Sequence, residues 1–338
     1  MVGSKRPGRC TGGISLVKDA EYDVVIAGGG IAGLTAGLTS ARAGRKTRVL
    51  TGESLGGHLV SIERIDGYPG FPDGIAGYDL CPIIQEQAVG AGAEFAAITA
   101  TALHADAGRW RVTTGQGDVW TRALIIATGT TLKTLGIPGE EQLRGKGVSH
   151  CASCDAPLLR GRIVGVVGGG DSALQEALTL AQHAARVIIL HRGTAFSAQA
   201  TYVQQVQQNA KIEVRFGTIV EEAIGNGGLK SVRTRTVTDG KTGEIELSGL
   251  FVYVGLAPET RLLEGVLAVD ASGRIPVDGE MRSSVPGLLA AGTVRSGAAG
   301  RAASAAGDGA TAALSADRYL KTERGPANHL RQGYGGPP

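Results

Sequence analysis

The sequence predicts an α/β protein that contains two Rossmann-like dinucleotide-binding folds. Twice along the chain, at 22–50 and at 163–190, an apolar strand meets a glycine-rich turn, a helix and a second short apolar strand. Strands that alternate with helices are typical of βαβ units and parallel sheets. A length of 338 residues, of which 42% are hydrophobic, also suits two domains that each bury a core.

The composition narrows the classes of function. Glycine accounts for 54 residues, without the Gly-X-Y period of collagen. The formal net charge of +3 is small and scattered, which argues against nucleic acid or an anionic membrane surface as a partner. No signal peptide is readable at 1–20, and no apolar run approaches the ~18 residues of a spanning helix. We therefore expect a soluble, cytoplasmic protein with small partners.

The first unit joins a strand at 22–27 to the strand Thr47–Leu50. The turn between them allows the backbone to approach a pyrophosphate at the N-terminus of a helix that runs through Ala43. In a chain this rich in glycine, roughly one G-x-G-x-x-G arises by chance, so the flanking strand and helix support the assignment. Glu53 could bond ribose hydroxyls, or it could be a solvated loop residue. The candidate cofactor-binding residues in the turn are Gly28, Gly30, Ile31, Ala32 and Gly33.

The second unit has the same order, with strands Ile163–Val167 and Arg186–Leu190 around a helix that ends near His183. Two dinucleotide folds suggest two dinucleotides. His191 and Arg192 follow the last strand without an acidic neighbour, and one arginine could meet a 2′-phosphate, which weakly favours NADPH over NADH. The candidate residues in the second turn are Gly168, Gly170, Asp171, Ser172 and Ala173.

Cys151 and Cys154 form a C-x-x-C pair between the two folds. This spacing brings two sulfurs close enough for a small-ring disulfide, and a helix that starts there would stabilise a thiolate. A zinc site would need two more ligands at suitable spacing, and Cys10 and Cys81 do not supply a second pair, so we expect no metal. An inert buried pair is the other alternative.

Further motifs occur in order around these turns: Gly56-Gly57, Gly-Tyr-Pro-Gly-Phe-Pro at 67–72, Ala127-Thr128-Gly129 and Pro-Gly-Leu-Leu-Ala-Ala-Gly at 286–292. With these motifs and the Cys pair, the chain resembles the low-molecular-weight thioredoxin reductases of the pyridine nucleotide–disulfide oxidoreductase class over about 22–320. The joint match is very specific for the fold and for flavin chemistry, and less specific for the substrate.

The resemblance implies an FAD-binding domain built from 21–135 and 252–320. A pyridine-nucleotide domain, 136–251, carries the Cys pair and is inserted between these segments, with mobile tails at 1–20 and 321–338. A helix that starts near 301 would aim its N-terminus at the flavin. The implied flavin-site residues are Gly57, His58, Asp66, Ala127, Thr128, Gly129, Gly292, Thr293, Arg301, Ala302 and Ala303.

The resemblance also implies an order of electron transfer. Reduced pyridine nucleotide, NADPH or NADH, would pass a hydride to FAD, and the flavin would reduce the disulfide through Cys154, leaving Cys151 to exchange with thioredoxin, a similar small redox protein or a low-molecular-weight disulfide. Asp155 matches the acid of the family, but it would need a raised pKa to act at neutral pH, and it could instead cap a helix. His150 could relay protons or be an ordinary loop residue. A homodimer is implied as well, with domains that rotate about crossings near 134–136 and 250–254.

The sequence departs from the family pattern at five positions. Thr293 stands where an aspartate normally bonds the ribityl chain, and Ala302 and His58 replace glutamines near the flavin ring. Gly193 and Ser197 replace two of three arginines that clamp the 2′-phosphate, a loss on the order of 3–6 kcal/mol before compensation. We therefore expect NADH to be accepted appreciably.

Two other functions use the same architecture. A dithiol oxidase would take electrons from a small dithiol and pass them from the flavin to O₂, an interpretation that the weakened nucleotide contacts favour and the intact second turn opposes. A flavin-bound redox sensor would keep the fold without turnover, which the Cys pair with its adjacent aspartate opposes.

Overall fold

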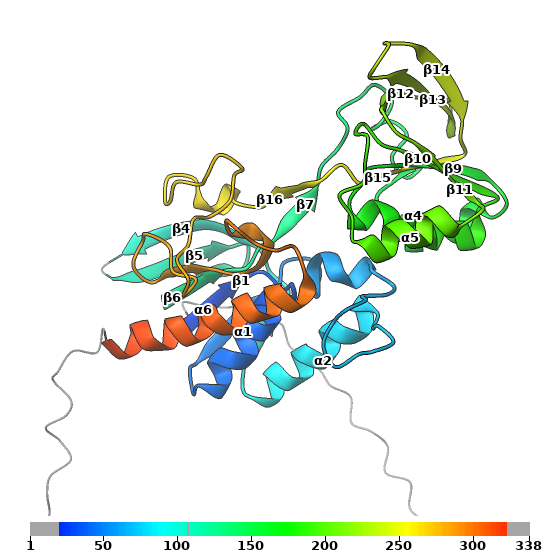
Figure 1. Cartoon of the computed structure of the whole chain (residues 1–338). Helices are drawn as coiled ribbons and strands as arrows, with labels where there is room; N and C mark the ends of the chain where they lie inside the picture. The colour runs from blue at the N-terminus through cyan, green and yellow to red at the C-terminus, as the bar shows by residue number, and fades with distance from the viewer. Residues whose placement is uncertain (1–19, 107, 323–338) are drawn as a thin grey trace, which may run out of the picture.

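The computed structural model describes residues 20–106 and 108–322, which form two α/β domains joined by two extended crossings (Figure 1). The tails expected at 1–20 and 321–338 lie outside these residues, apart from Ala20 and residues 321–322. Within the described residues, no helix combines the length and the apolar character that a membrane span requires.

A seven-stranded sheet forms the first domain in the order β3-β2-β1-β6-β5-β4, with β17 also paired to β6. Strands β1, β2, β3, β6 and β17 are parallel, whereas β5 and β4 add an antiparallel edge. The strands are β1 (Ala20–Ala27), β2 (Thr47–Leu50), β3 (Glu94–Ala96), β4 (Ala100–Asp106), β5 (Arg109–Thr114), β6 (Gly117–Ile126) and β17 (Leu288–Ala290). Because β17 comes from the C-terminal part of the chain, two distant segments complete one sheet.

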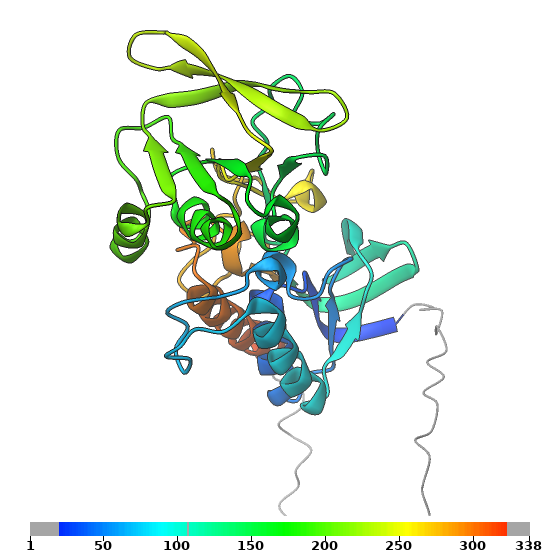
Figure 2. The ribbon, with the colours of Figure 1, turned by 90° about the vertical axis from the view of Figure 1, so that its right-hand side faces the viewer.

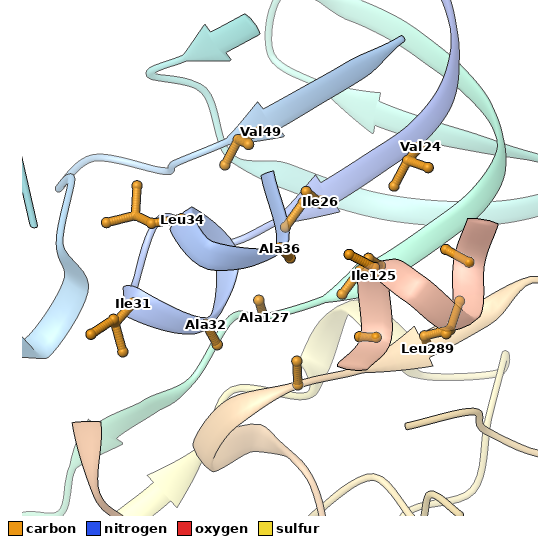
Figure 3. Close-up of a cluster of buried hydrophobic side chains, with 14 of the residues drawn as sticks. Val24, Ile26, Ile31, Ala32, Leu34, Ala36, Val49, Ile125, Ala127 and Leu289 are labelled. Atoms are coloured by element: carbon orange, nitrogen blue, oxygen red, sulfur yellow. The ribbon is translucent and has the colours of Figure 1, made fainter. Parts of the chain in front are cut away.

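Three helices cover one face of this sheet (Figure 1). Their apolar side chains pack against β1 and β2 in a cluster that includes Val24, Ile26 and Leu34 (Figure 3). Helices α1 and α6 cross in contact, because a Cβ at Gly309 would lie only 2.1 Å from the Ala32 oxygen. The helices are α1 (Ile31–Arg42), α2 (Gly77–Gly90) and α6 (Ala302–Thr322).

The other face of the first sheet carries a separate buried cluster. Trp110, Leu124 and Leu288 belong to it, and Leu263 covers it from the short turn η3 (Arg261–Leu263). Both faces of the central parallel strands are therefore covered, as expected for strands that are apolar throughout.

The second domain contains a five-stranded parallel sheet in the order β11-β10-β9-β15-β8. Figure 1 shows α4 and α5 on one side of it and the antiparallel sheet β12-β13-β14 beyond the other side, and Figure 2 shows the same layers turned by 90°. The strands are β8 (Val148–Ser149), β9 (Ile163–Val167), β10 (Arg186–Leu190), β11 (Ile212–Arg215), β12 (Thr218–Gly225), β13 (Leu229–Thr236), β14 (Thr242–Glu246) and β15 (Gly249–Val252). The helices are α3 (Ala152–Asp155), η2 (Ala156–Leu159), α4 (Asp171–His183) and α5 (Ala200–Gln208).

Two short antiparallel strands, β7 (Thr130–Leu132) and β16 (Leu256–Pro258), carry the chain between the domains. The crossing expected near 134–136 follows β7 directly. The one expected near 250–254 lies partly in β15, which is a central strand of the second sheet, and β16 makes the actual return.

Both predicted strand–turn–helix–strand units are present. The expected strands at 22–27 and 47–50 are parts of β1 and β2, and those at 163–167 and 186–190 are β9 and β10. The predicted fold class, α/β with two dinucleotide-binding folds, is confirmed.

Candidate active site

The redox pair lies at the start of a short helix in the second domain. Cys151 and Cys154 are joined by a disulfide, with their Cα atoms 5.4 Å apart. Cys151 occupies the N-cap position of α3, and its sulfur accepts the Cys154 backbone N–H at 3.3 Å. A backbone donor at a helix N-terminus favours the thiolate form of a reduced cysteine. Cys154 is exposed, so one sulfur-bearing residue of the pair is open to the surroundings.

Asp155 and His150 flank the pair on opposite sides. Asp155 is half-buried, and its carboxylate makes neither a hydrogen bond nor a side-chain cap with the described residues; the α3 cap is Cys151 instead. His150 Nε2 is buried without a hydrogen-bond partner among those residues. Desolvation, and secondarily the Arg144 charge, lowers the pKa of His150, so the imidazole is neutral at pH 7.

The first glycine-rich turn is shaped for an anionic ligand. Gly28 has φ of +124°, and a Cβ there would lie 2.1 Å from the Ala127 oxygen, so strands β1 and β6 meet here without room for a side chain. Gly30 is the N-cap of α1, has extended backbone and supplies no side-chain cap. A Cβ on Gly30 would meet nothing within 4 Å. The first N–H groups of α1, at Ile31 and Ala32, have no acceptor within the helix and no side-chain cap, which leaves them available to a pyrophosphate.

The loop that carries Gly57 and His58 lies against this turn. Gly30 and Gly56 form an isolated parallel bridge, and a Cβ on Gly57 would lie 3.3 Å from the Gly30 Cα. His58 belongs to the turn η1 (Gly57–Ser61) and is exposed, yet the protein around its ring lowers the pKa of the imidazole by desolvation. The structure thus brings these predicted residues to the first turn from about 25 positions further along the chain.

The remaining flavin-side candidates lie at strand ends of the same sheet. Ala127, Thr128 and Gly129 follow β6, and the Thr128 hydroxyl donates to the Glu259 carbonyl at 2.7 Å. Glu53 follows β2, is exposed and has no hydrogen-bond partner among the described residues, which leaves its carboxylate available to a ribose.

The last flavin motif contains a buried ion pair that the sequence analysis missed. Asp308 accepts from the Gly292 backbone N–H at 3.1 Å and binds Arg295 with two bonds of 2.7 and 2.8 Å. Thr293, which replaces the usual aspartate of the family, places its hydroxyl 3.3 Å from that of Thr130. A lone aspartate within the alanine- and glycine-rich stretch of α6 was the available signal for Asp308.

Asp66 occupies a different environment from the other flavin-side candidates. Its carboxylate accepts from the Arg64 guanidinium at 2.7 Å and, weakly, from the Tyr202 hydroxyl of the second domain at 3.5 Å. These contacts connect Asp66 to the domain interface, and none joins it to the first glycine-rich turn.

The second glycine-rich turn repeats the geometry of the first. A Cβ at Gly168 would lie 2.4 Å from the backbone carbonyl oxygen of Tyr253 and 2.8 Å from the Ala173 Cβ, so the ends of β9 and β15 and the start of α4 meet closely. Gly170 caps α4 with extended backbone and no side-chain bond, which leaves the N–H groups after it, including that of Ser172, free for a pyrophosphate. The Asp171 carboxylate already accepts from the Gln199 backbone N–H at 2.7 Å.

A single cation is available for a nucleotide 2′-phosphate among the residues that follow β10. The His191 side chain folds back over the turn, and a Cβ on Gly169 would lie only 2.4 Å from its ring atoms. The ring packs against that of Phe196, with the two ring centroids 5.8 Å apart. Arg192 is exposed and has no hydrogen-bond or ion-pair partner among the described residues. Ser197, in place of an arginine of the family, bonds the Gly169 carbonyl through its backbone N–H at 2.9 Å and its hydroxyl at 3.3 Å.

Among the described residues, side-chain hydrogen bonds and an ion pair join the two domains. Asp171 pairs with Arg301, which directly precedes α6 and the candidates Ala302 and Ala303. The others are Gln175 with the Arg64 carbonyl, Ser153 with the Ser61 carbonyl at 3.3 Å, and Tyr202 with Asp66. The second turn therefore faces the N-terminus of α6, the helix expected to point at the flavin.

The site has no metal-binding character in the part of the chain that the structure describes. Residues 20–106 and 108–322 contain no group of three or more His, Cys, Asp and Glu side chains placed to hold an ion. Each of the two turns, by contrast, opens a helix whose first backbone N–H groups have no side-chain cap, and this feature fits two dinucleotides, FAD on the first turn and a pyridine nucleotide on the second.

The sequence belongs with known reductases. Residues 22–309 match the pyridine nucleotide-disulphide oxidoreductase family. The thioredoxin reductase of Treponema pallidum is 36% identical over 90% of this chain and 99% of its own length, and that of Listeria innocua is 38% identical over 89% and 94%. A bifunctional thioredoxin reductase/thioredoxin of Mycobacterium leprae is 36% identical over 90% of this chain and 67% of its own length.

Solved structures lead to the same family. Lactococcus lactis thioredoxin reductase in the FR conformation superposes with a TM-score of 0.87 at 35% identity, over 89% of this chain and 99% of its own. The T. acidophilum thioredoxin reductase superposes with a TM-score of 0.85 at 33% identity, over 90% of this chain and 100% of its own. The thioredoxin reductase of Streptococcus pyogenes superposes with a TM-score of 0.61 at 33% identity, again over 90% of this chain and 100% of its own. With its two dinucleotide turns and its disulfide, the chain is an FAD-dependent pyridine nucleotide–disulfide oxidoreductase, and it belongs to the low-molecular-weight thioredoxin reductase family.

Proposed function

We propose that this protein reduces thioredoxin, or a closely similar small disulfide protein, with electrons from a reduced pyridine nucleotide. The observation that supports this most directly is the Cys151–Cys154 disulfide at the start of a helix, where the Cys154 N–H bonds the Cys151 sulfur. The Mycobacterium leprae relative carries a thioredoxin in the same chain as the reductase, which supports thioredoxin as the partner.

The residues around the pair have distinct tasks in this proposal. Bound FAD would carry two electrons from the nicotinamide to the disulfide. Cys154 receives them on the flavin side, and Cys151, whose thiolate the Cys154 N–H stabilises, exchanges with the partner disulfide. Asp155, which directly follows Cys154, occupies the place of the acid of the family. His150, neutral at pH 7, accepts or returns a proton beside Cys151.

An exposed leucine beside the pair supports a protein partner. Leu158 is 81% exposed, the largest value among the exposed large hydrophobic side chains of the described residues, and lies four positions after Cys154. We expect Leu158→Ser to raise the KM for thioredoxin about three- to tenfold, because an apolar anchor at an interface is lost. Its kcat/KM for the small disulfide 5,5′-dithiobis(2-nitrobenzoate) should stay unchanged.

Val237→Ser supplies the control, since Val237 is 51% exposed on the second domain, far along the chain from the pair. An equal loss with the protein and the small disulfide would contradict docking through Leu158.

The nucleotide preference follows from the few charges near the second turn. Arg192 is the free cation there, and Ser197 is turned toward Gly169. We expect kcat/KM for NADH to be within about 100-fold of that for NADPH, because one guanidinium supplies only part of a phosphate clamp. Steady-state kinetics with both nucleotides decides this, and a larger preference for NADPH would show the prediction to be wrong.

The direction of electron flow has a direct test. Anaerobic addition of NADH or NADPH to the purified flavoprotein should bleach the flavin rapidly, and Cys151→Ser should keep this bleaching while abolishing thioredoxin reduction. Bleaching only by a small dithiol would instead indicate a dithiol oxidase that passes electrons to O₂.

A homodimer and a cytoplasmic location complete the proposal. Tyr78, Ile83 and Val89 on α2 and Leu314 on α6 leave large apolar surface exposed on the first domain, which suits a self-association face. A partner that is kept in its dithiol form and a supply of reduced nucleotide fit the reducing cytoplasm. Light scattering after size-exclusion chromatography tests the dimer.

A further inference from the structure

Two polar side chains lie beneath the helix that carries the disulfide: Tyr253 is buried, and Glu176 is half-buried with its Oε2 atom shielded from solvent. Glu176 is on α4, and Tyr253 directly follows β15. Ala152 and Ala156, the buried residues of α3 and η2, pack in the same apolar cluster as Tyr253. Neither polar residue belongs to the set of candidate site residues, and neither lies in a glycine-rich motif.

Glu176 and Tyr253 face each other and the backbone of the redox helix. The Glu176 carboxylate faces both the Ala152 backbone N–H and the Tyr253 hydroxyl. Oε2 of Glu176 and Oη of Tyr253 are shielded from solvent, and neither completes a hydrogen bond of normal geometry with the described residues. Tyr253 is only 8% exposed. Buried polar atoms without full partners are costly, so their presence beside a reactive group points to a role there.

No cation among the described residues compensates Glu176. The charged group that acts on its carboxylate is Glu63, from the loop after η1, and Asp155 acts on Tyr253 from α3. Burial, with a smaller contribution from Glu63, raises the pKa of Glu176 to about 7. Burial and the Glu176 charge raise the pKa of Tyr253 as well, so the phenol stays neutral. Glu176 is therefore protonated below about pH 7 and charged above it.

The charge of Glu176 opposes the stabilisation of a thiolate on Cys151. The Ala152 N–H is the first backbone donor of α3, and the Cys154 N–H bonds the Cys151 sulfur from the same turn. A negative carboxylate beneath the Ala152 N–H weakens the favourable field of this helix end, and a neutral carboxyl does not.

We propose that Glu176 and Tyr253 are positioning residues for the redox pair, a buried acid–phenol couple that holds the start of α3 and sets the acidity of the Cys151 thiol through the charge on Glu176. This deepens the proposed function, because it rests on Cys151 being the thiol that meets the partner. The couple exchanges only a proton with solvent, and the electrons follow the path already described.

The test measures the acidity of Cys151 without nucleotide or thioredoxin. The holoenzyme is reduced with dithiothreitol and treated with iodoacetamide between pH 6 and 9. The alkylation of Cys151 is followed by mass spectrometry with peptide fragmentation, which separates it from Cys154 on the same peptide and from Cys10 and Cys81. We expect the rate of Cys151 alkylation in the wild type to rise with pH and to show two inflections. The inflection near pH 7 makes the rise less steep, because Glu176 becomes charged there.

Glu176→Gln keeps the shape of the side chain and removes its charge. This variant should lose the inflection near pH 7 and react about three- to tenfold faster than wild type at pH 8, since the Cys151 thiol becomes more acidic. Tyr253→Phe should move the inflection to higher pH, because the phenol favours the charged carboxylate. Glu246→Gln, an exposed residue of β14 in the same domain, is the control and should leave the profile unchanged.

A Glu176→Gln profile that superposes on wild type would overturn the inference. Lower stability with unmoved inflections would overturn it too, because a structural role alone changes unfolding and not the pH dependence. Either outcome leaves the proposed function standing, which fails separately if thioredoxin is not reduced.

Discussion

Asp308 and Glu176 are both carboxylates on helices with oxygen atoms shielded from solvent, but their surroundings are opposite. Asp308 is held by the Arg295 guanidinium and the Gly292 N–H, whereas Glu176 has only an acidic residue as its charged neighbour among the described residues. The first arrangement fixes the backbone of the turn at Gly292, and the second leaves a proton that can be exchanged near neutral pH. Of these two carboxylates, Asp308 therefore has a structural role, whereas Glu176 can gain or lose a proton.

Removing the charge of Asp308 should be costly for folding. Asp308→Asn leaves Arg295, whose side chain is only 15% exposed, without its carboxylate. Breaking a buried pair at one partner typically costs about 3–5 kcal/mol, so we expect the free energy of unfolding to fall by about 3 kcal/mol. Urea denaturation measures this, and retained FAD per chain reports the loosened Gly292 loop. Glu264→Gln, at an exposed position, is the control, and an unchanged midpoint for Asp308→Asn would contradict the prediction.

The sequence predicted those candidate site residues whose chemistry follows from a short sequence motif. Cys151, Cys154 and the glycines of both turns are of this kind, because spacing along a strand–turn–helix unit fixes their geometry. The couple of Glu176 with Tyr253, and that of Asp308 with Arg295, escaped prediction. Their meeting depends on how helices pack, and no short motif records it.

At the scale of elements, the parallel strands were predictable and the antiparallel ones were not. Apolar runs such as Arg186–Leu190 are buried along nearly their whole length and read clearly as strands. In β12 and β13, two register shifts interrupt the pairing, and buried and exposed positions no longer alternate strictly. The period-2 signal on which a strand prediction depends is lost there.

The crossing of α1 and α6 has a matched pair of glycines that tests its role. Gly309→Ala would place a Cβ 2.1 Å from the Ala32 oxygen, whereas the same change at Gly307 meets nothing within 4 Å. We expect Gly309→Ala to lower the free energy of unfolding by about 2 kcal/mol or more through overpacking. Gly307→Ala should raise it by about 0.5–1 kcal/mol, because alanine favours the helix. Thermal unfolding of both holoenzymes compares them, and equal effects would rule out close packing as the reason for Gly309.

At the scale of the whole molecule, the relative placement of the domains depends on few contacts. Streptococcus pyogenes thioredoxin reductase has nearly the identity and coverage of the L. lactis and T. acidophilum enzymes, but its TM-score is 0.61 instead of 0.85–0.87. Equal sequence similarity with a poorer global superposition is what different placements of similar domains produce. Such placements could not be predicted from the sequence, because polar contacts at an interface leave no periodic signal.

The ion pair of Arg301 with Asp171 should stabilise the observed placement modestly. The two side chains are 50% and 19% exposed, and pairs of this kind contribute about 0–1 kcal/mol. Without added nucleotide, we expect Arg301→Gln or Asp171→Asn to speed hydrogen exchange of the interface backbone at 61–64 up to about fivefold. The double variant should add nothing further, because either change removes the same pair. Amides of β12–β14, which lie beyond the second sheet from this interface, serve as the internal control (Figure 1). Additive effects in the double variant, or equal acceleration in β12–β14, would mean that the two residues do not act as one contact between the domains.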